Sequence, residues 1–178
     1  MDFNSYRIPK PKMSLSVETK RIFKKILETI SECEIVVERH RQELCEIPSF
    51  APYSAFCRID RYATESIDAA GIQSFMKDNG GGSGTLLPST VLSIGDCSKV
   101  LRFFDSDEDG IMSYNDFLQM VLPCDNNMLR AQAQKRPYTR VGRFDNLSYD
   151  IECGLYNIIQ HEVDFIKRME NLIQELEY

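Results

Sequence analysis

The sequence lacks several features that mark common functional classes. It contains only two histidines, and its six cysteines are scattered with no Cys-x-x-Cys pair. A zinc site or a Ser-His-Asp hydrolase therefore has few residues to draw on. The cysteines are expected to be reduced structural thiols. Because none of them has an obvious activating base nearby in the sequence, we expect a protein that is not an enzyme.

Long hydrophobic runs are missing as well. No stretch approaches the roughly 18 apolar residues that indicate a membrane-spanning helix, and the first residues lack the apolar segment of a secretory signal. The net charge of −6 and the isoelectric point of about 5.0 argue against a general nucleic-acid-binding protein. We expect a cytoplasmic protein with no membrane span and no specific nucleic-acid partner.

The charge that is present alternates along the chain. A basic Pro/Lys tail at 1–13 and a basic linker at 125–146, with five bases and two acids, separate segments that are acidic. Charge asymmetry of this kind points to partners rather than to fold. RNA or acidic lipid could bind the linker, but a run of this kind more often contacts an acidic protein surface or water. The tail and the linker would suit an acidic polymer surface, and microtubules are a candidate.

Both ends of the chain show helical periodicity. Apolar residues recur at spacings of three and four over 14–47, where Pro48 ends the pattern, and two adjacent apolar stripes run over 147–178, one of them interrupted at Glu162. His40 lies on the apolar stripe of the segment 14–47, where a packed histidine is favoured over a metal ligand. Helices this broadly apolar must be covered, either by each other and the middle of the chain, which is favoured, or by a helical protein partner. For a partner we expect these contact residues: Phe23, Ile30, Val37, Met76, Met120, Ile159, Ile166 and Ile173.

The strongest motif in the sequence spans residues 105–116, which read Asp-Ser-Asp-Glu-Asp-Gly-Ile-Met-Ser-Tyr-Asn-Asp. Calcium takes about six to eight oxygen ligands, and a loop of about 12 residues can supply them from alternate positions. Apolar residues at helical spacing precede and follow this loop. The segment 97–124 therefore resembles the helix–loop–helix of the EF-hand superfamily, which implies these metal ligands: Asp105, Asp107, Asp109, the carbonyl of Ile111, Ser113 and Asp116.

A second, degenerate loop at 60–71 fits the same frame. Asp60 takes the first position, and Ile67 takes the position that should bridge to Met112 of the other loop. Tyr62, Glu65 and Gly71 replace the third ligand, the sixth-position glycine and the closing carboxylate. We therefore expect a calmodulin-like pair over 48–124 whose first loop is structural and empty, with a flexible Gly-rich insertion at 79–84. The alternative is that 48–76 is a helical pair without EF-hand ancestry.

The closing residue of the loop at 105–116 departs from the family pattern. EF-hand loops usually end in a bidentate Glu, whereas this loop ends in the shorter Asp116. We expect one weak Ca²⁺ site, with Mg²⁺ as the other possible occupant.

The resemblance implies an all-α fold: an EF-hand pair with long amphipathic N- and C-terminal helices. It also suggests a non-enzymatic calcium-binding subunit that binds helical partners in a large cytoskeletal assembly, such as a cilium or its axoneme with their microtubules. The alternative is a soluble calcium sensor that regulates its partner when calcium binds.

Overall fold

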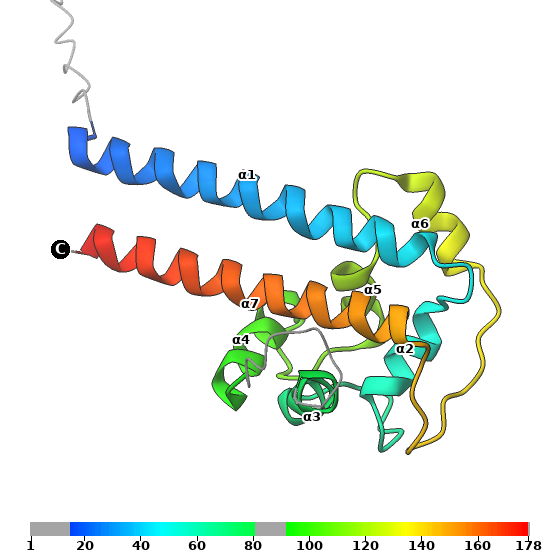
Figure 1. The fold of residues 1–178 in the computed structure, drawn as a ribbon. Coiled ribbons are helices and arrows are strands. Elements are labelled where there is room, and N and C mark those ends of the chain that lie inside the picture. The colour runs from blue at the N-terminus through cyan, green and yellow to red at the C-terminus, as the bar shows by residue number, and fades with distance from the viewer. Residues whose placement is uncertain (1–14, 81–91, 178) are drawn as a thin grey trace, which may run out of the picture.

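The computed structural model describes residues 15–80 and 92–177, and the fold of these residues is all-α, as the sequence predicts (Figure 1). The predicted tail at 1–13 and positions 81–84 of the Gly-rich insertion lie outside the described residues. No helix in the described part of the chain is both long and apolar enough to cross a membrane. The helices are α1 (Val17–Glu46), α2 (Pro52–Ile59), α3 (Ala69–Gly80), α4 (Ile94–Phe104), α5 (Tyr114–Val121), α6 (Asn127–Gln134) and α7 (Tyr149–Glu177).

The two long helices α1 and α7 form an antiparallel hairpin, with the start of α1 beside the end of α7 (Figure 1). Near that end, Lys25 Nζ lies 3.3 Å from Glu175 Oε1. Further along, the imidazole rings of His40 and His161 stack with their centroids 4.8 Å apart. The terminal helices therefore cover each other within the chain, and His40 is a packed residue.

A glycine lets the two long helices approach closely near the base of the hairpin. A Cβ atom added at Gly154 of α7 would lie only 2.9 Å from Cδ1 of Leu44 on α1. Leu44 is itself buried. The small residue at 154 therefore sets the spacing of α1 and α7 at this level.

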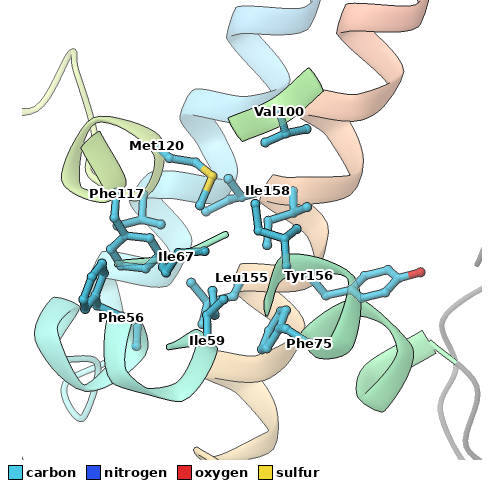
Figure 2. Packing of buried hydrophobic residues seen from close by; sticks show 14 of the residues in the cluster. Phe56, Ile59, Ile67, Phe75, Val100, Phe117, Met120, Leu155, Tyr156 and Ile158 are labelled. Carbon is cyan, nitrogen blue, oxygen red and sulfur yellow. The ribbon is translucent and has the colours of Figure 1, made fainter. Parts of the chain in front are cut away.

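The shorter helices α2 to α5 pack their apolar faces against the base of the hairpin. Figure 2 shows side chains of α2, α3, α4 and α5 meeting side chains of α7 in one core. Burying apolar surface in this way is the main favourable term in folding. The core residues labelled there include Phe56, Ile59, Phe75, Val100, Phe117, Leu155 and Ile158.

Half of the residues predicted to contact a partner are buried in this core. Val37, Met76, Met120 and Ile159 are at most 3% exposed, so they are core residues in this structure and are not available to a partner. The reason is that the apolar stripes of α1 and α7 are covered from within the chain at their base. The other four residues remain at least partly accessible: Phe23, Ile30, Ile166 and Ile173.

Two ion pairs are buried inside this packing. Arg41 on α1 donates from Nη2 to Glu162 Oε1 on α7 at 2.9 Å, which explains why the apolar stripe of α7 is interrupted at that residue. Arg58 on α2 donates from Nε to Glu152 Oε1 at 2.7 Å. All four side chains are nearly inaccessible. A buried charge without its partner is strongly destabilising, so each pair holds its helices in one arrangement.

Helix α3 extends two residues further than the glycine-rich sequence suggests. Asn79 donates from Nδ2 to the Phe75 carbonyl oxygen at 3.1 Å and to Glu152 Oε2 at 2.7 Å. A Cβ atom added at Gly80 would lie 3.3 Å from the Tyr156 ring. These contacts with α7 keep residues 79 and 80 helical, and the prediction of a loop at these two positions is wrong.

Part of the basic linker packs on the chain itself. Arg136 donates to the carbonyl oxygens of Cys45, Ile47 and Phe50 at distances of 2.7 to 2.9 Å. The last carbonyls of a helix lack partners within the helix and carry partial negative charge, so a guanidinium is well placed at the end of α1. The expectation that the linker faces a partner is therefore wrong for Arg136.

Candidate metal site

The loop between α4 and α5 is organised by its first residue. Asp105 Oδ1 accepts a hydrogen bond from the Asp109 amide at 3.2 Å, and Asp105 Oδ2 accepts one from the Gly110 amide at 2.8 Å. Gly110 has a φ of 85°, a conformation that glycine adopts without strain. The carboxylate at the first position and the glycine at the sixth together fold the chain into a closed turn.

Three predicted ligands converge on one side of this turn. One carboxylate oxygen from each of Asp105, Asp107 and Asp109 lies within 4.8 Å of the others. Repulsion from the Asp109 carboxylate, which is the largest influence, raises the pKa of Asp107. Carboxylate oxygens are the ligands that hard divalent cations such as Ca²⁺ and Mg²⁺ prefer. The three side chains therefore form a cluster that a divalent cation would suit.

The predicted closing ligand, Asp116, is not part of this cluster. Its Oδ2 accepts hydrogen bonds from the Ser113 amide at 3.0 Å and from Ser113 Oγ at 2.6 Å, and its Oδ1 accepts one from Ser106 Oγ at 2.7 Å. Ser113 and Asp116 thereby form a capping box at the start of α5. Burial works against the charged carboxylate of Asp116, but the hydrogen bonds from Ser113 and Ser106 outweigh burial and lower its pKa.

The remaining predicted ligands also serve the loop in this structure. The Ile111 amide donates to Asp109 Oδ1 at 2.9 Å, and the Ser113 hydroxyl is held by Asp116. The structure thus brings three of the six predicted ligands into one cluster and places the other three residues around it. Ser106 was missed by the sequence prediction, since the second position of such a loop carries no expected role that would have identified it.

The degenerate loop after α2 repeats the hydrogen-bond pattern of the metal loop. Asp60 Oδ1 accepts from the Thr64 amide at 3.0 Å, and Asp60 Oδ2 accepts from the Glu65 amide at 2.9 Å. These donors occupy the fifth and sixth positions, as Asp109 and Gly110 do in the other loop. Glu65 has a φ of 61°, a left-handed conformation, at the position where the other loop has glycine. Within the described ranges, no group of three potential metal-binding side chains forms here.

The two loops are joined by the predicted antiparallel bridge. The Ile67 amide donates to the Met112 carbonyl oxygen at 2.9 Å, and the Met112 amide donates to the Ile67 carbonyl oxygen at 2.8 Å. Both side chains are at most 1% exposed and belong to the core, and Figure 2 shows the Ile67 side chain among the core residues. The prediction that these two residues pair is confirmed, and the bridge fixes the two loops side by side.

The two buried thiols, those of Cys45 and Cys97, lie in surroundings that do not activate them. Burial is the main cause that raises the pKa of Cys45 to about 12 and that of Cys97 to about 11. A nucleophilic cysteine needs a lowered pKa, because the thiolate is the reactive form. These two residues act as small apolar side chains in the core.

Together the fold and the loops define a pair of helix–loop–helix units, linked by a two-residue bridge and covered by a helical hairpin. Comparisons of the chain with protein-family models, with curated proteins and with solved structures found no match. Assignment of a function therefore depends on the geometry of the described residues.

Proposed function

We propose that the chain is a non-enzymatic EF-hand calcium-binding protein that acts as a structural or adaptor subunit. The observation that supports this proposal best is the bridge between Ile67 and Met112, with hydrogen bonds of 2.8 and 2.9 Å that join two loops of the same design. In both loops, the first-position carboxylate accepts the amides of the fifth and sixth residues. Such a repeat, flanked on each side by helices with buried apolar faces, is what an EF-hand pair requires.

In this proposal the loop at 105–116 holds one divalent cation, and the loop at 60–71 holds none. The cation would bind the carboxylates of Asp105, Asp107 and Asp109. Asp116 would have to give up its hydrogen bonds from Ser113 and Ser106 to join them, and its single short carboxylate is poorly suited to bidentate ligation. We therefore propose weak Ca²⁺ binding, with Mg²⁺ as a competing occupant.

The packing of α7 favours a constitutive role over a calcium switch. The apolar faces of α2 to α5 that a sensor would expose are already covered by α7, through residues such as Leu155 and Ile158. Shifting a two-state equilibrium from 1:99 to 99:1 takes about 5.5 kcal/mol of differential binding. One weak site supplies little of this free energy. A soluble calcium sensor is the second candidate, and it would require α7 to leave the core when the metal binds.

The partners that we propose are helical proteins of a large cytoskeletal assembly, such as a cilium or an axoneme with its microtubules. Support comes from the two long helices of the hairpin, whose ends carry exposed apolar side chains, including Phe23 at 55% and Ile173 at 48%. The basic segments of the chain suit an acidic polymer. Co-sedimentation of the chain with microtubules, in calcium and in chelator, would test this assignment, and equal binding in both is expected.

Calorimetric titration with Ca²⁺ and then with Mg²⁺ tests the metal site directly. We expect at most one Ca²⁺ site with a Kd weaker than about 10⁻⁶ M. The Asp105→Asn variant should abolish it, because Asp105 belongs to the carboxylate cluster. The matched Asp60→Asn variant, at the first position of the other loop, should leave it unchanged. Two tight sites, or a site that survives Asp105→Asn, would contradict the proposal.

A further inference from the structure

The closing carboxylate of the loop at 105–116 is held by two serines, one near each end of the loop. Asp116 Oδ1 accepts a hydrogen bond from Ser106 Oγ at 2.7 Å, and Asp116 Oδ2 accepts hydrogen bonds from the amide and the hydroxyl of Ser113 at 3.0 and 2.6 Å. The Asp116 residue is only 4% exposed. Each carboxylate oxygen therefore has a donor within the protein, and little of the group is open to water.

The two serines differ in what they do at this carboxylate. Ser113 directly precedes α5, and its hydrogen bonds with Asp116 form the capping box that satisfies amides at the start of the helix. Ser106 lies ten positions before Asp116 in the chain, and its hydroxyl takes no part in the capping box. We call the hydrogen bond from Ser106 Oγ to Asp116 Oδ1 the latch, because it ties the start of the loop to the closing carboxylate.

The described loop at 60–71 has no counterpart of the latch. Its second position is Arg61, which donates from Nη2 to Asp78 Oδ2 on α3 at 2.7 Å. Its twelfth position is Gly71, which has no side chain to accept a hydrogen bond. Of the two loops, the latch therefore occurs only in the one that also carries the carboxylate cluster.

The latch competes with the ligation of one ion more than with that of the other. Calcium takes about six to eight oxygen ligands, so it gains from the closing carboxylate in addition to the three carboxylates of the cluster. Magnesium is octahedral, usually keeps several waters, and binds through about one or two carboxylates. The cluster can therefore serve Mg²⁺ while the latch stays closed, whereas full ligation of Ca²⁺ needs Asp116 Oδ1, the oxygen that Ser106 holds.

We infer that the Ser106 hydroxyl withholds Asp116 from Ca²⁺ and thereby sets the balance between Ca²⁺ and Mg²⁺ at this loop. The inference rests on the proposed metal site and names the residue that regulates its selectivity. Ser106 acts through Asp116 and does not itself bind the ion, so it is a positioning residue. A hydrogen bond to a charged group is worth about a tenfold change or more in an equilibrium constant, which is the size of the effect that the latch exerts.

The Ser106→Ala variant removes the latch and leaves every carboxylate of the loop in place. Because Ca²⁺ no longer has to displace the hydroxyl, we expect its Kd in calorimetric titration to fall about tenfold. The Kd for Mg²⁺ should change by less than about twofold, because this ion leaves the latch closed. Ser106→Thr, which keeps a hydroxyl, should retain the wild-type ratio of the two Kd values, and Ser31→Ala on α1 is the matched control. Equal changes for both ions would overturn the inference, since a merely structural effect would not distinguish them.

A double-mutant cycle tests whether Ser106 acts through Asp116. The Asp116→Asn variant keeps the size of the side chain and an oxygen acceptor for Ser113, but it removes the charge that a cation needs. In this background, Ser106→Ala should change the Kd for Ca²⁺ by less than about twofold. A full tenfold gain in the Asp116→Asn background would refute the latch, because Ser106 would then act on Ca²⁺ by another route. Circular dichroism confirms that each variant is folded.

Thermal melting provides a second readout of the same hydrogen bond. In chelator, Ser106→Ala should melt about 3–6 °C below the wild-type protein, because the variant has lost the latch. Saturating Mg²⁺ should leave this difference unchanged. Saturating Ca²⁺ should abolish it, since Ca²⁺ has already opened the latch in the wild-type protein. A difference that persists in Ca²⁺ would contradict the inference.

The outcomes separate this inference from the proposed function. If the wild-type protein binds Ca²⁺ and Ser106→Ala binds it no more tightly, only the latch is wrong. If the wild-type protein binds neither ion and Ser106→Ala binds Ca²⁺, the proposed calcium-binding function is wrong and the latch is supported. If neither protein binds either ion, both the proposed function and the latch are wrong.

Discussion

The fold disfavours the charged form of Glu162. Its side chain is 1% exposed, in the seam between α1 and α7, and burial is the main cause that raises its pKa from 4.5 to about 7. The guanidinium of Arg41 acts in the opposite direction but does not cancel this effect. The folded state therefore holds a proton at Glu162 in a pH range where the unfolded chain has released it.

The sign and the size of the effect on stability follow from this difference in proton binding. Where the folded state binds more protons, the free energy of unfolding falls as the pH rises. Each pH unit between 4.5 and about 7 removes up to about 1.4 kcal/mol. The contribution of Glu162 is thus fully present below pH 4.5 and is lost as the pH rises through about 7, a total of about 3 kcal/mol.

The Glu162→Gln variant isolates this contribution, because glutamine keeps an acceptor for Arg41 but does not titrate. Urea unfolding of both proteins, followed by circular dichroism in chelator from pH 4.5 to 8, gives the difference in free energy of unfolding at each pH. We expect the wild-type protein to lose about 3 kcal/mol relative to the variant across this range. Glu28→Gln, which removes an exposed carboxylate from α1, is the matched control.

Two outcomes would refute this reasoning. A difference between wild type and Glu162→Gln that is constant with pH would show that burial does not shift the titration of Glu162. A difference that grows in favour of the wild type as the pH rises would show that Arg41 stabilises the carboxylate more than burial penalises it.

Two other buried features give predictions of a similar kind. Arg58→Met leaves the Glu152 carboxylate buried without its main partner and should lower the free energy of unfolding by about 3–5 kcal/mol, whereas Lys24→Met on the surface of α1 should leave thermal melting nearly unchanged. Gly154→Val adds a branched side chain where even a Cβ would lie 2.9 Å from Leu44 Cδ1, and overpacking of this kind costs about 1–3 kcal/mol. Chemical denaturation measures both, and a neutral Arg58→Met or Gly154→Val would contradict the packing described.

Local features of this fold could be predicted well from the sequence. The two long helices were predicted from periodicity, a short-range rule that depends only on neighbouring residues, and both are present. The pairing of Ile67 with Met112 was implied by the resemblance to EF-hand loops, and it is present as well.

The features that the sequence left open depend on distant residues. Nothing near Glu162 indicates that Arg41, 121 positions away, would lie opposite it. In the same way, the sequence could not show that Arg136 would bind the end of α1 or that Asp116 would cap α5 instead of joining the carboxylate cluster. In each case a polar group is paired within the chain, where the sequence alone predicts a partner molecule, a metal ion or no partner.

The antiparallel hairpin also determines how this protein would respond to force. Because the start of α1 and the end of α7 lie side by side, tension applied through both would peel the helices apart from that end and not shear them along their length. The contacts would open one after another: first Lys25 with Glu175, then the stacked rings of His40 and His161, and then Arg41 with Glu162. Breaking contacts in sequence takes less force than breaking them together. If force were applied at opposite ends of the hairpin instead, the contacts between the two helices would be loaded together, and the hairpin would resist extension as a stiff rod.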